Sequence, residues 1–169
     1  IEALAGQRVV AVSAGQFHSI AITVDGAVCS WGYGYFGRLG HGDEQRQLLP
    51  TKVEFLAGRS VVAVSAGSRH SLALTADGAV WSWGWGWEGK LGHGDEQDQL
   101  LPKKVEALAG QRVVAVSAGF MHSIALAADG AVWSWGMGGF GTLGHGDQQD
   151  QLLPKKIEAL AGQHVVDVS

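Results

Sequence analysis

The sequence of 169 residues has little of several features that define common protein classes. It contains one cysteine, Cys29, which excludes an internal disulfide framework. Charged residues make up 17% of the chain and the formal net charge is -4, so binding to a nucleic-acid backbone is not expected. At 46% hydrophobic residues, the composition also differs from that of disordered chains, which combine low hydrophobicity with high net charge.

Long apolar segments and leader sequences are also missing. No apolar run approaches the ~20 residues of a membrane-spanning helix, so no transmembrane segment is predicted. The sequence contains no secretory hydrophobic region and no basic leader, and it starts at Ile1, in the middle of a repeat. We therefore expect a processed product, an excised segment or part of something longer. The compartment is open: cytoplasm, nucleus, or an organelle after removal of a leader.

The dominant feature that is present is a repeat with a period of 52 residues. Residues 9–13 read VVAVS and return at 61–65, at 113–117 and, with Asp167 in place of alanine, at 165–169. The chain is therefore predicted to be a single repeat domain over residues 1–169. Its repeats cover residues 1–52, 53–104 and 105–156, followed by a partial fourth repeat at 157–169.

Each repeat reads as short extended segments without a helix. In the second copy we expect these segments at residues 61–67, 70–75, 79–85 and 103–108. Asp77-Gly78 lies between the second and third segments and is a strong hairpin signal. Four strands in about fifty residues fit one blade of a β-propeller. The sequence therefore predicts an all-β fold in which three four-stranded blades form an open arc.

Three linked motifs carry a family resemblance. They are GxxHS[IL]A[IL] at residues 15–22, DGAVxSWG at 25–32 and GxLGHGD at 37–43, and all recur one and two periods later. Over its whole length the chain resembles the repeats of the regulator of chromosome condensation family. The resemblance implies a β-propeller, usually of seven blades, so the three blades would belong to a larger ring or be completed by another subunit.

Members of this family do not share one activity, so function has to be argued separately from fold. They include a nucleotide exchange factor for a small GTPase, modules of giant ubiquitin ligases and a plant UV-B photoreceptor. In the photoreceptor, the sensing tryptophans directly follow the glycine of the GxxH motif, where this chain has Gln16, Ser68 and Phe120. The exchange activity relies on a full ring and an inserted wedge, and this chain has no insertion between its repeats.

We therefore expect a non-enzymatic scaffold or linker subunit that binds proteins within a larger assembly. The alternative is a regulator of a small GTPase, of the nucleotide exchange type, as part of a longer chain. A third class is a structural piece that closes an oligomer.

The three copies differ mainly at two groups of positions in or beside loops. These positions are rich in aromatic, Met and basic side chains, a composition typical of interface cores. Loosely constrained loop tips are the simpler explanation, but exposed aromatic clusters are unfavourable without a partner. The predicted partner-binding residues are Phe17, Tyr33, Tyr35, Phe36, Arg38, Arg69, Trp85, Trp87, Glu88, Lys90, Phe120, Met121, Met137 and Phe140.

Positions that are the same in every copy are predicted to build the scaffold. We expect the GxxH histidine to bond the neighbouring backbone, the Asp-Gly pairs to form hairpin turns, and the tryptophan of SWG to pack between blades. The predicted structural residues are His18, His70, His122, Trp31, Trp83, Trp135, Asp25, Gly26, Asp77, Gly78, Asp129 and Gly130.

Motifs that look like ligand or catalytic sites have simpler explanations. Each repeat contains GxGxxG, as at Gly32, Gly34 and Gly37, but a dinucleotide site needs a helix after it and no helical pattern follows. Pairs such as His41 and Asp43 are typical of turns, and their spacing gives no sign of converging metal ligands. We therefore predict no cofactor, no metal site and no catalytic residue.

The two ends of the chain duplicate each other, because residues 1–13 and 157–169 are the same part of the repeat. A propeller ring closes when strands from both ends complete one shared blade, and duplicate ends cannot do this. The strand edges at each end have to be covered. We expect further blades of the same chain to cover them, with a longer parent favoured, or else another subunit.

Overall fold

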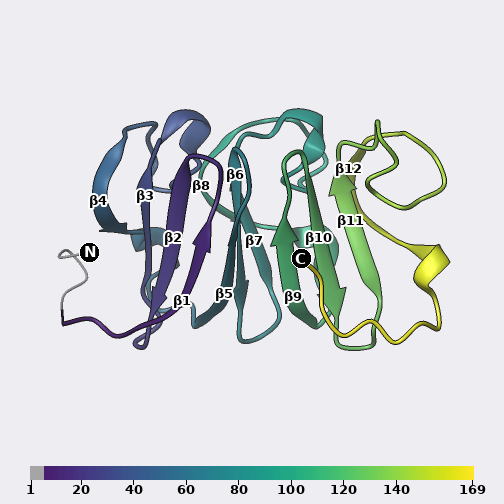
Figure 1. Cartoon of the computed structure of the whole chain (residues 1–169), viewed down its shortest axis with the longest axis horizontal. Coiled ribbons are helices and arrows are strands. Elements are labelled where there is room, and N and C mark those ends of the chain that lie inside the picture. The colour runs from purple at the N-terminus through teal and green to yellow at the C-terminus, as the bar shows by residue number, and fades with distance from the viewer. Residues whose placement is uncertain (1–5) are drawn as a thin grey trace.

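The computed structural model describes residues 6–169, which form three four-stranded antiparallel sheets arranged side by side (Figure 1). The first sheet contains β1 (Val9–Ala14), β2 (His18–Thr23), β3 (Val28–Gly32) and β4 (Gln47–Lys52). The second contains β5 (Val61–Ala66), β6 (His70–Thr75), β7 (Val80–Gly84) and β8 (Gln99–Lys104). The third contains β9 (Val113–Ala118), β10 (His122–Ala127), β11 (Val132–Gly136) and β12 (Gln151–Lys156). The predicted open arc of three blades is confirmed.

A tight turn at Asp25 and Gly26 joins β2 to β3, where the sequence predicts a hairpin. Gly26 has a φ of 80°, a conformation that side chains with a Cβ rarely adopt. Its N–H donates to the Thr23 carbonyl at 2.8 Å. Gly78 and Gly130 both have a φ of 84° at the equivalent turns. The three sheets therefore share the same hairpin between their second and third strands.

The fourth strand of each blade is shifted from its predicted place. In the second blade the prediction was residues 103–108, whereas β8 covers Gln99–Lys104 and Glu106–Leu108 forms the 3-10 turn η5. The chain leaves the sheet because Val105 turns its side chain into the core, where it is buried. Pro102 lies inside β8, which is possible because β8 is an edge strand. Equivalent turns follow the other two fourth strands, at η3 (Glu54–Leu56) and η6 (Glu158–Leu160).

The hydrophobic core lies between neighbouring sheets. Ile20 and Ile22 of β2 belong to one buried cluster with Val61 and Trp83 of the second sheet. A similar cluster joins the second sheet to the third around Trp135. The three sheets provide two such junctions, and a third, smaller cluster lies between the outer face of the third sheet and the C-terminal segment.

Hydrogen bonds from the recurrent histidine and tryptophan also cross between sheets. His18 Nε2 lies 2.8 Å from Ser71 Oγ, and Ser71 Oγ donates to the Arg38 carbonyl at 2.8 Å. The Trp83 indole N–H donates to the same carbonyl at 2.9 Å. The prediction that the histidine bonds neighbouring backbone is therefore wrong in its partner, because the ring reaches a serine of the next blade.

The burial of the recurrent tryptophan and of the recurrent histidine depends on their position in the arc. Trp83 and Trp135 are fully buried, whereas Trp31 on the outer face of the first sheet is half-buried. His122 in the third sheet is also half-buried, although its equivalent His70 is fully buried. Identical residues thus differ in burial because the outer faces of the described arc lack a neighbouring blade.

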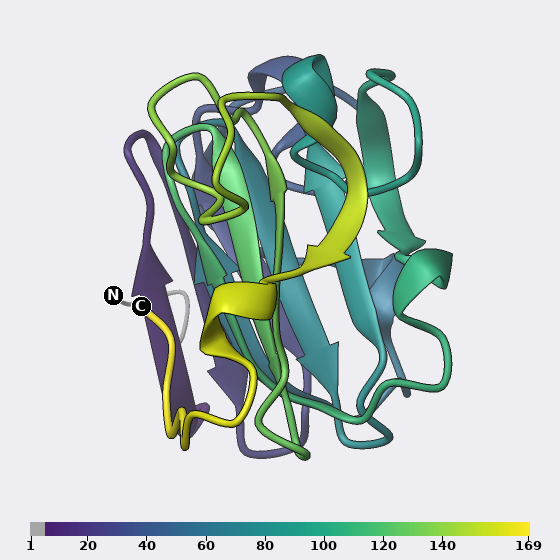
Figure 2. The same cartoon turned by 90° about the vertical axis from the view of Figure 1, so that its right-hand side faces the viewer.

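Residues 157–169 start a fourth repeat but add no strand. After η6 they continue without regular structure along the third sheet, shown in yellow in Figure 2. Val165 and Val168 pack against a small cluster that includes Ile157. The equivalent N-terminal stretch contains β1, and its residues 1–5 lie outside the described part of the chain.

Candidate partner-binding surface

Six aromatic side chains form a continuous row across the loops of the first two blades. We call this row the aromatic ladder; its members, in order, are Phe17, Tyr33, Tyr35, Phe36, Trp85 and Trp87. Successive ring centroids are 6.4, 5.5, 5.3, 5.2 and 5.0 Å apart, distances at which aromatic pairs attract each other. Phe36 carries the row across the junction, because its ring stacks on Trp85 of the next blade. All six belong to the predicted partner-binding set.

The loop backbone that carries these rings is held in an unusual conformation. Phe36 has a φ of 60° and Glu88 a φ of 58°, values that are uncommon outside glycine. In each loop the N–H of this residue donates to a glutamate side chain at 2.9 Å, Glu44 in the first blade and Glu96 in the second. The two loops contain the 3-10 turns η2 (Tyr35–Gly37) and η4 (Trp87–Gly89).

Cationic groups lie over the faces of the ladder rings. The Lys90 ammonium is 3.9 Å and the Arg69 guanidinium 4.6 Å from the centroid of the Trp85 ring. The Arg38 guanidinium is 5.4 Å from the centroid of Tyr33. Cations within about 6 Å of a ring centroid are attracted by its negative face. These contacts, together with ring stacking, fix the orientation of the ladder.

Arg38 and Lys90 do not lie on the surface where the sequence places them. Their side chains are buried, at 1% and 0% exposure. Arg38 donates to the carbonyls of Ser68 and Tyr35, each at 3.0 Å, and Lys90 Nζ donates to the Trp87 carbonyl at 2.7 Å. Burial lowers the pKa of Lys90 to about 8. Both side chains support the ladder from inside the blade junctions and are not available for contact with a partner.

Glu88 is also buried, although it was predicted to contact a partner. Its Oε2 atom has no hydrogen-bond partner among the residues that the structure describes. Burial raises the pKa of this carboxyl group, while the nearby Lys90 acts in the opposite direction. Glu88 is therefore a buried residue of the second loop, and it also lines the apolar pocket described next.

An apolar pocket of about 340 Å³ opens at the Trp87 end of the ladder. Its walls come mainly from Trp87 of the second blade and from Phe120, Met121, Met137 and Phe140 of the third. Three of these side chains are exposed and the two methionines are half-buried. A mostly apolar pocket of this size accepts a large apolar side chain. The structure thus brings together predicted residues from two blades.

Three further residues lie at this surface that the sequence did not place among the partner-binding residues. The Arg46 guanidinium is 5.4 Å from the centroid of the Tyr33 ring, and His122 and Thr142 line the pocket. Arg46 could have been found, because the equivalent residues of the other copies are aspartates and the position therefore varies between repeats. His122 gives no such signal, since histidine is present in every copy.

The motifs that resemble ligand sites form loop structure. Within residues 6–169, no three His, Cys, Asp or Glu side chains are placed to hold one metal ion. His41 Nε2 lies 3.0 Å from Ser30 Oγ, and Asp43 accepts a hydrogen bond from the Gln45 N–H at 2.9 Å. At the GxGxxG motif, a Cβ on Gly34 would collide with the Gln45 carbonyl, so glycine is needed there for close backbone packing.

Comparisons with known proteins agree with this architecture. The model of the RCC1-like domain matches residues 2–169. The chain is 39% identical over 169 residues to the ultraviolet-B receptor UVR8 of Arabidopsis thaliana, and 43% identical over 171 residues to the E3 ubiquitin-protein ligase HERC2 of Homo sapiens. These alignments cover 100% of this chain but only 38% of the receptor and 4% of the ligase. The chain thus spans well under half the length of these relatives.

Two solved structures resemble the arc closely. Human WBSCR16 superimposes with a TM-score of 0.81 at 30% identity, over 89% of this chain and 38% of that protein. Prp20p of Saccharomyces cerevisiae gives a TM-score of 0.82 at 28% identity, over 92% of this chain and 40% of the yeast protein. Separately, none of the helical turns in the described part of the chain has the length and apolar character needed to cross a membrane.

Proposed function

Because the chain belongs to the RCC1-like domain family, we propose that it is a non-enzymatic protein-binding module that acts as a scaffold or linker in a larger assembly. The partner binds at the aromatic ladder and the apolar pocket. The observation that carries this proposal is the exposed pocket of Trp87, Phe120, Met121, Met137 and Phe140 at the end of a row of fixed rings.

The cost of leaving this surface in water supports the proposal. Trp87 is 47% exposed and Phe120 is 60% exposed, although both are large apolar side chains. Clusters of exposed apolar side chains mark interaction sites, and Trp and Tyr are enriched among the residues that dominate binding energy. Because stacking and cationic contacts already hold the ladder rings, less side-chain entropy is lost when a partner binds.

The charges beside the pocket indicate what kind of partner fits. Glu96 accepts a hydrogen bond from the N–H of Glu88, which lines the pocket, and Asp150 accepts one from the N–H of Gly138, next to the pocket residue Met137. Carboxylates from two loops therefore lie beside the pocket wall. Complementary charge steers association and selects among partners. We therefore expect a partner segment in which a large apolar anchor is flanked by basic residues.

The experiment is selection from a random-peptide display library on the immobilised chain, followed by measurement of Kd for the enriched peptides. Phe120→Asp places a charge at the pocket and is expected to weaken binding by about 10-fold or more, as for a central interface residue. Val62→Asp is the matched control, because Val62 is 54% exposed and lies outside the pocket. Equal Kd values for Phe120→Asp and the unmodified chain would show that the pocket is not the binding site.

The second candidate is a regulator of a small GTPase. The observation in its favour is the likeness to yeast Prp20p, whose structure was described together with its binding to Gsp1p and histones. Release of labelled GDP from a panel of small GTPases, with this chain and with any longer parent, separates the two candidates. Faster release of GDP would contradict the non-enzymatic scaffold function and support the exchange function. Unchanged release rates would contradict the exchange function.

A further inference from the structure

The connection that leads into the second blade carries three residues that no other copy of the repeat has. They are Phe55, Arg59 and Ser60, whereas the other two full copies have alanine, glutamine and arginine at these positions. The second sheet has a neighbouring sheet packed on each side. The three residues therefore belong to the middle of the arc, and their exposure does not result from a position at either end of it.

The connection lies at the opposite end of the strands from the aromatic ladder. Trp85 of the ladder directly follows the end of β7, whereas the hairpin that joins β6 to β7 precedes its start. In Figure 1 this hairpin is at the lower edge of the molecule, and the turns η2 and η4 of the ladder loops are at the upper edge. The connection and the hairpin border an opening of about 590 Å³, which we call the hairpin pocket; its wall includes Arg59, Asp77, Trp81 and Lys104.

Arg59 is held against two aromatic rings in the hairpin pocket. Its guanidinium is 4.5 Å from the centroid of the Trp81 ring and 5.0 Å from that of Phe55. These two rings contact each other edge to face at 6.0 Å. Arg59 Nε donates to the Phe55 carbonyl at 2.9 Å. Stacking and this hydrogen bond fix the side chain, so a partner that binds its remaining N–H groups costs little side-chain entropy.

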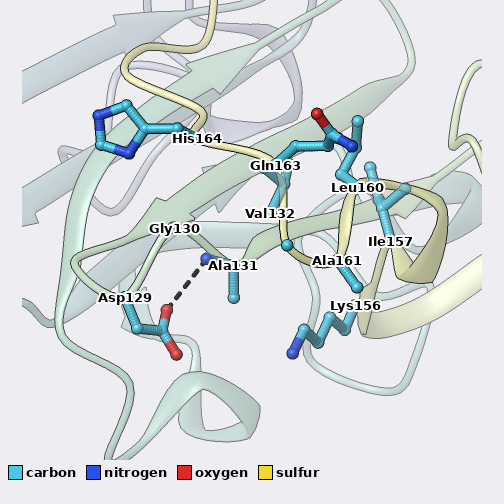
Figure 3. Close-up of a pocket in the computed structure, with 11 residues that line it drawn as sticks. Asp129, Gly130, Ala131, Val132, Lys156, Ile157, Leu160, Ala161, Gln163 and His164 are labelled. Atoms are coloured by element: carbon cyan, nitrogen blue, oxygen red, sulfur yellow. Dashed lines mark hydrogen bonds between the residues drawn. The ribbon is translucent and has the colours of Figure 1, made fainter.

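A carboxylate of the same pocket, that of Asp77, is bound by its own hairpin. Asp77 Oδ1 accepts hydrogen bonds from the Thr75 hydroxyl and, at 3.3 Å, from the Ala79 N–H. Figure 3 shows the equivalent arrangement in the third blade, where the dashed line joins the Asp129 side chain to the Ala131 N–H at 3.0 Å. Asp77 is therefore a turn residue that the repeat needs, and it is not an ion-pair partner placed for Arg59.

The charges of the hairpin pocket favour an anion with a single charge. Within residues 6–169, neither Arg59 nor the half-buried Lys104 has an ion-pair partner. Two cations and the carboxylate of Asp77 leave the pocket wall with a net charge of +1. A carboxylate balances this charge and matches the planar guanidinium. A phosphate group, with about two negative charges, would be left partly unpaired beside Asp77.

We propose that the hairpin pocket is a second binding site, which takes a carboxylate side chain from an acidic segment of a partner protein. The carboxylate binds between Arg59 and Lys104, and an apolar neighbour in the same segment packs on Phe55, which is 39% exposed. The apolar pocket beside the ladder instead fits a segment with basic residues. Since the two sites lie at opposite ends of β7, the chain is suited to link two partners of opposite charge. The proposal does not depend on binding at the ladder.

Selection from a random-peptide display library on the full chain tests the proposal. The bait is the Phe120→Asp variant, in which the apolar pocket is blocked, and peptides that also bind the Phe120→Asp/Arg59→Gln chain are removed. Glutamine is the residue of the other copies at this position, so Arg59→Gln is expected to fold as the unmodified chain does. We expect the enriched peptides to contain Asp or Glu beside a large apolar residue. A selection that enriches no acidic peptide would overturn the proposal.

Kd values of the enriched peptides then measure the part of each cation. Arg59→Gln and Lys104→Gln are each expected to raise Kd by about 10-fold or more, as for the loss of one member of a charge pair. Lys156→Gln is the matched control and is expected to leave Kd unchanged. It makes the same change at the same repeat position of the third blade, where Gln111 replaces Arg59 in the preceding connection.

Variants of the peptide identify the group that binds. Replacing its Glu or Asp by the corresponding amide is expected to raise Kd by about 10-fold, whereas tighter binding of a phosphoserine peptide would overturn the assignment to a carboxylate. An unchanged Kd for Arg59→Gln would show that the hairpin pocket is not the site. In a chain with an intact apolar pocket, Arg59→Gln is expected to leave the Kd of peptides bound there unchanged, so failure of this proposal and failure of the proposed function can be told apart.

Discussion

The loops that carry the aromatic ladder differ from the corresponding loop of the third blade, although all three share most of their sequence. In the first two, η2 and η4 press against the next blade: a Cβ on Gly37 would lie 2.6 Å from the Leu100 Cα, and one on Gly89 2.5 Å from the Leu152 Cα. Around Gly141 there is nothing within 4 Å. The φ of Gly89 and of Gly141 is nevertheless 71° in both. Phe140, however, lacks the positive φ of its equivalents Phe36 and Glu88, and residues 139–141 form no 3-10 turn. The third loop therefore keeps the glycine conformation but differs from the other two in the residue before it and in burial.

We expect the largest difference between an inner and an outer position at the tryptophan that recurs in each blade. Trp83→Ala removes a fully buried side chain together with its hydrogen bond to the Arg38 carbonyl, and is expected to lower the free energy of unfolding by about 3–5 kcal/mol. Trp31→Ala changes the same repeat position on the outer face of the first sheet and is expected to lower the free energy of unfolding by about 2 kcal/mol or less, because that ring is half-buried. Urea denaturation of both variants measures the difference. Equal losses in the free energy of unfolding would show that burial at a blade junction does not increase the contribution of this tryptophan to stability.

Internal repetition made the scaffold predictable from the sequence. Comparison of the copies identifies the Asp25-Gly26 turn and the buried Trp83, because a residue that every blade needs returns at the same position. The fourth strand was misplaced because Pro102 was expected at the entry of a strand, whereas it lies inside the edge strand β8 and Val105 is buried in the core between sheets.

Contacts between blades could not be read from the sequence. Arg38 looks like an exposed loop cation, yet its guanidinium donates to the carbonyl of Ser68 in the next blade. That residue is distant in sequence, and only the packing of two sheets brings it near. The apolar pocket has the same origin, since Trp87 and Met137 come from different blades. Composition suggested which side chains bind, but their arrangement depends on the blade junctions.

Substitution of the loop glycines is expected to lower the free energy of unfolding by less than Trp83→Ala does. Gly89→Ala places a methyl group against the backbone of β12 and adds the strain of a positive φ, so a loss of about 2–4 kcal/mol is expected. Gly141→Ala carries the same strain without the collision, and a loss of about 1–2 kcal/mol is expected. Thermal or urea unfolding of the two variants measures the difference.

The smallest effect is the response of the junction histidines to acid. Burial, with a smaller contribution from nearby Lys90, lowers the pKa of His70 to about 3, whereas a histidine in the unfolded chain titrates near 6.5. Below pH 6.5 the unfolded state therefore binds more protons than the folded state, so stability is full above that pH and falls as the pH decreases toward 3. The contribution of His70 to this loss is about 2 kcal/mol at pH 5, since each pH unit corresponds to about 1.4 kcal/mol. Burial also lowers the pKa of the half-buried His122, but His122 lies on the outer face of the third sheet and should contribute less to the loss of stability. Urea denaturation between pH 7 and pH 5 is expected to show a shallower slope for His70→Gln than for His122→Gln. The same slope for both variants would show that a histidine at an internal junction is no better shielded from protons than one at the open end of the arc.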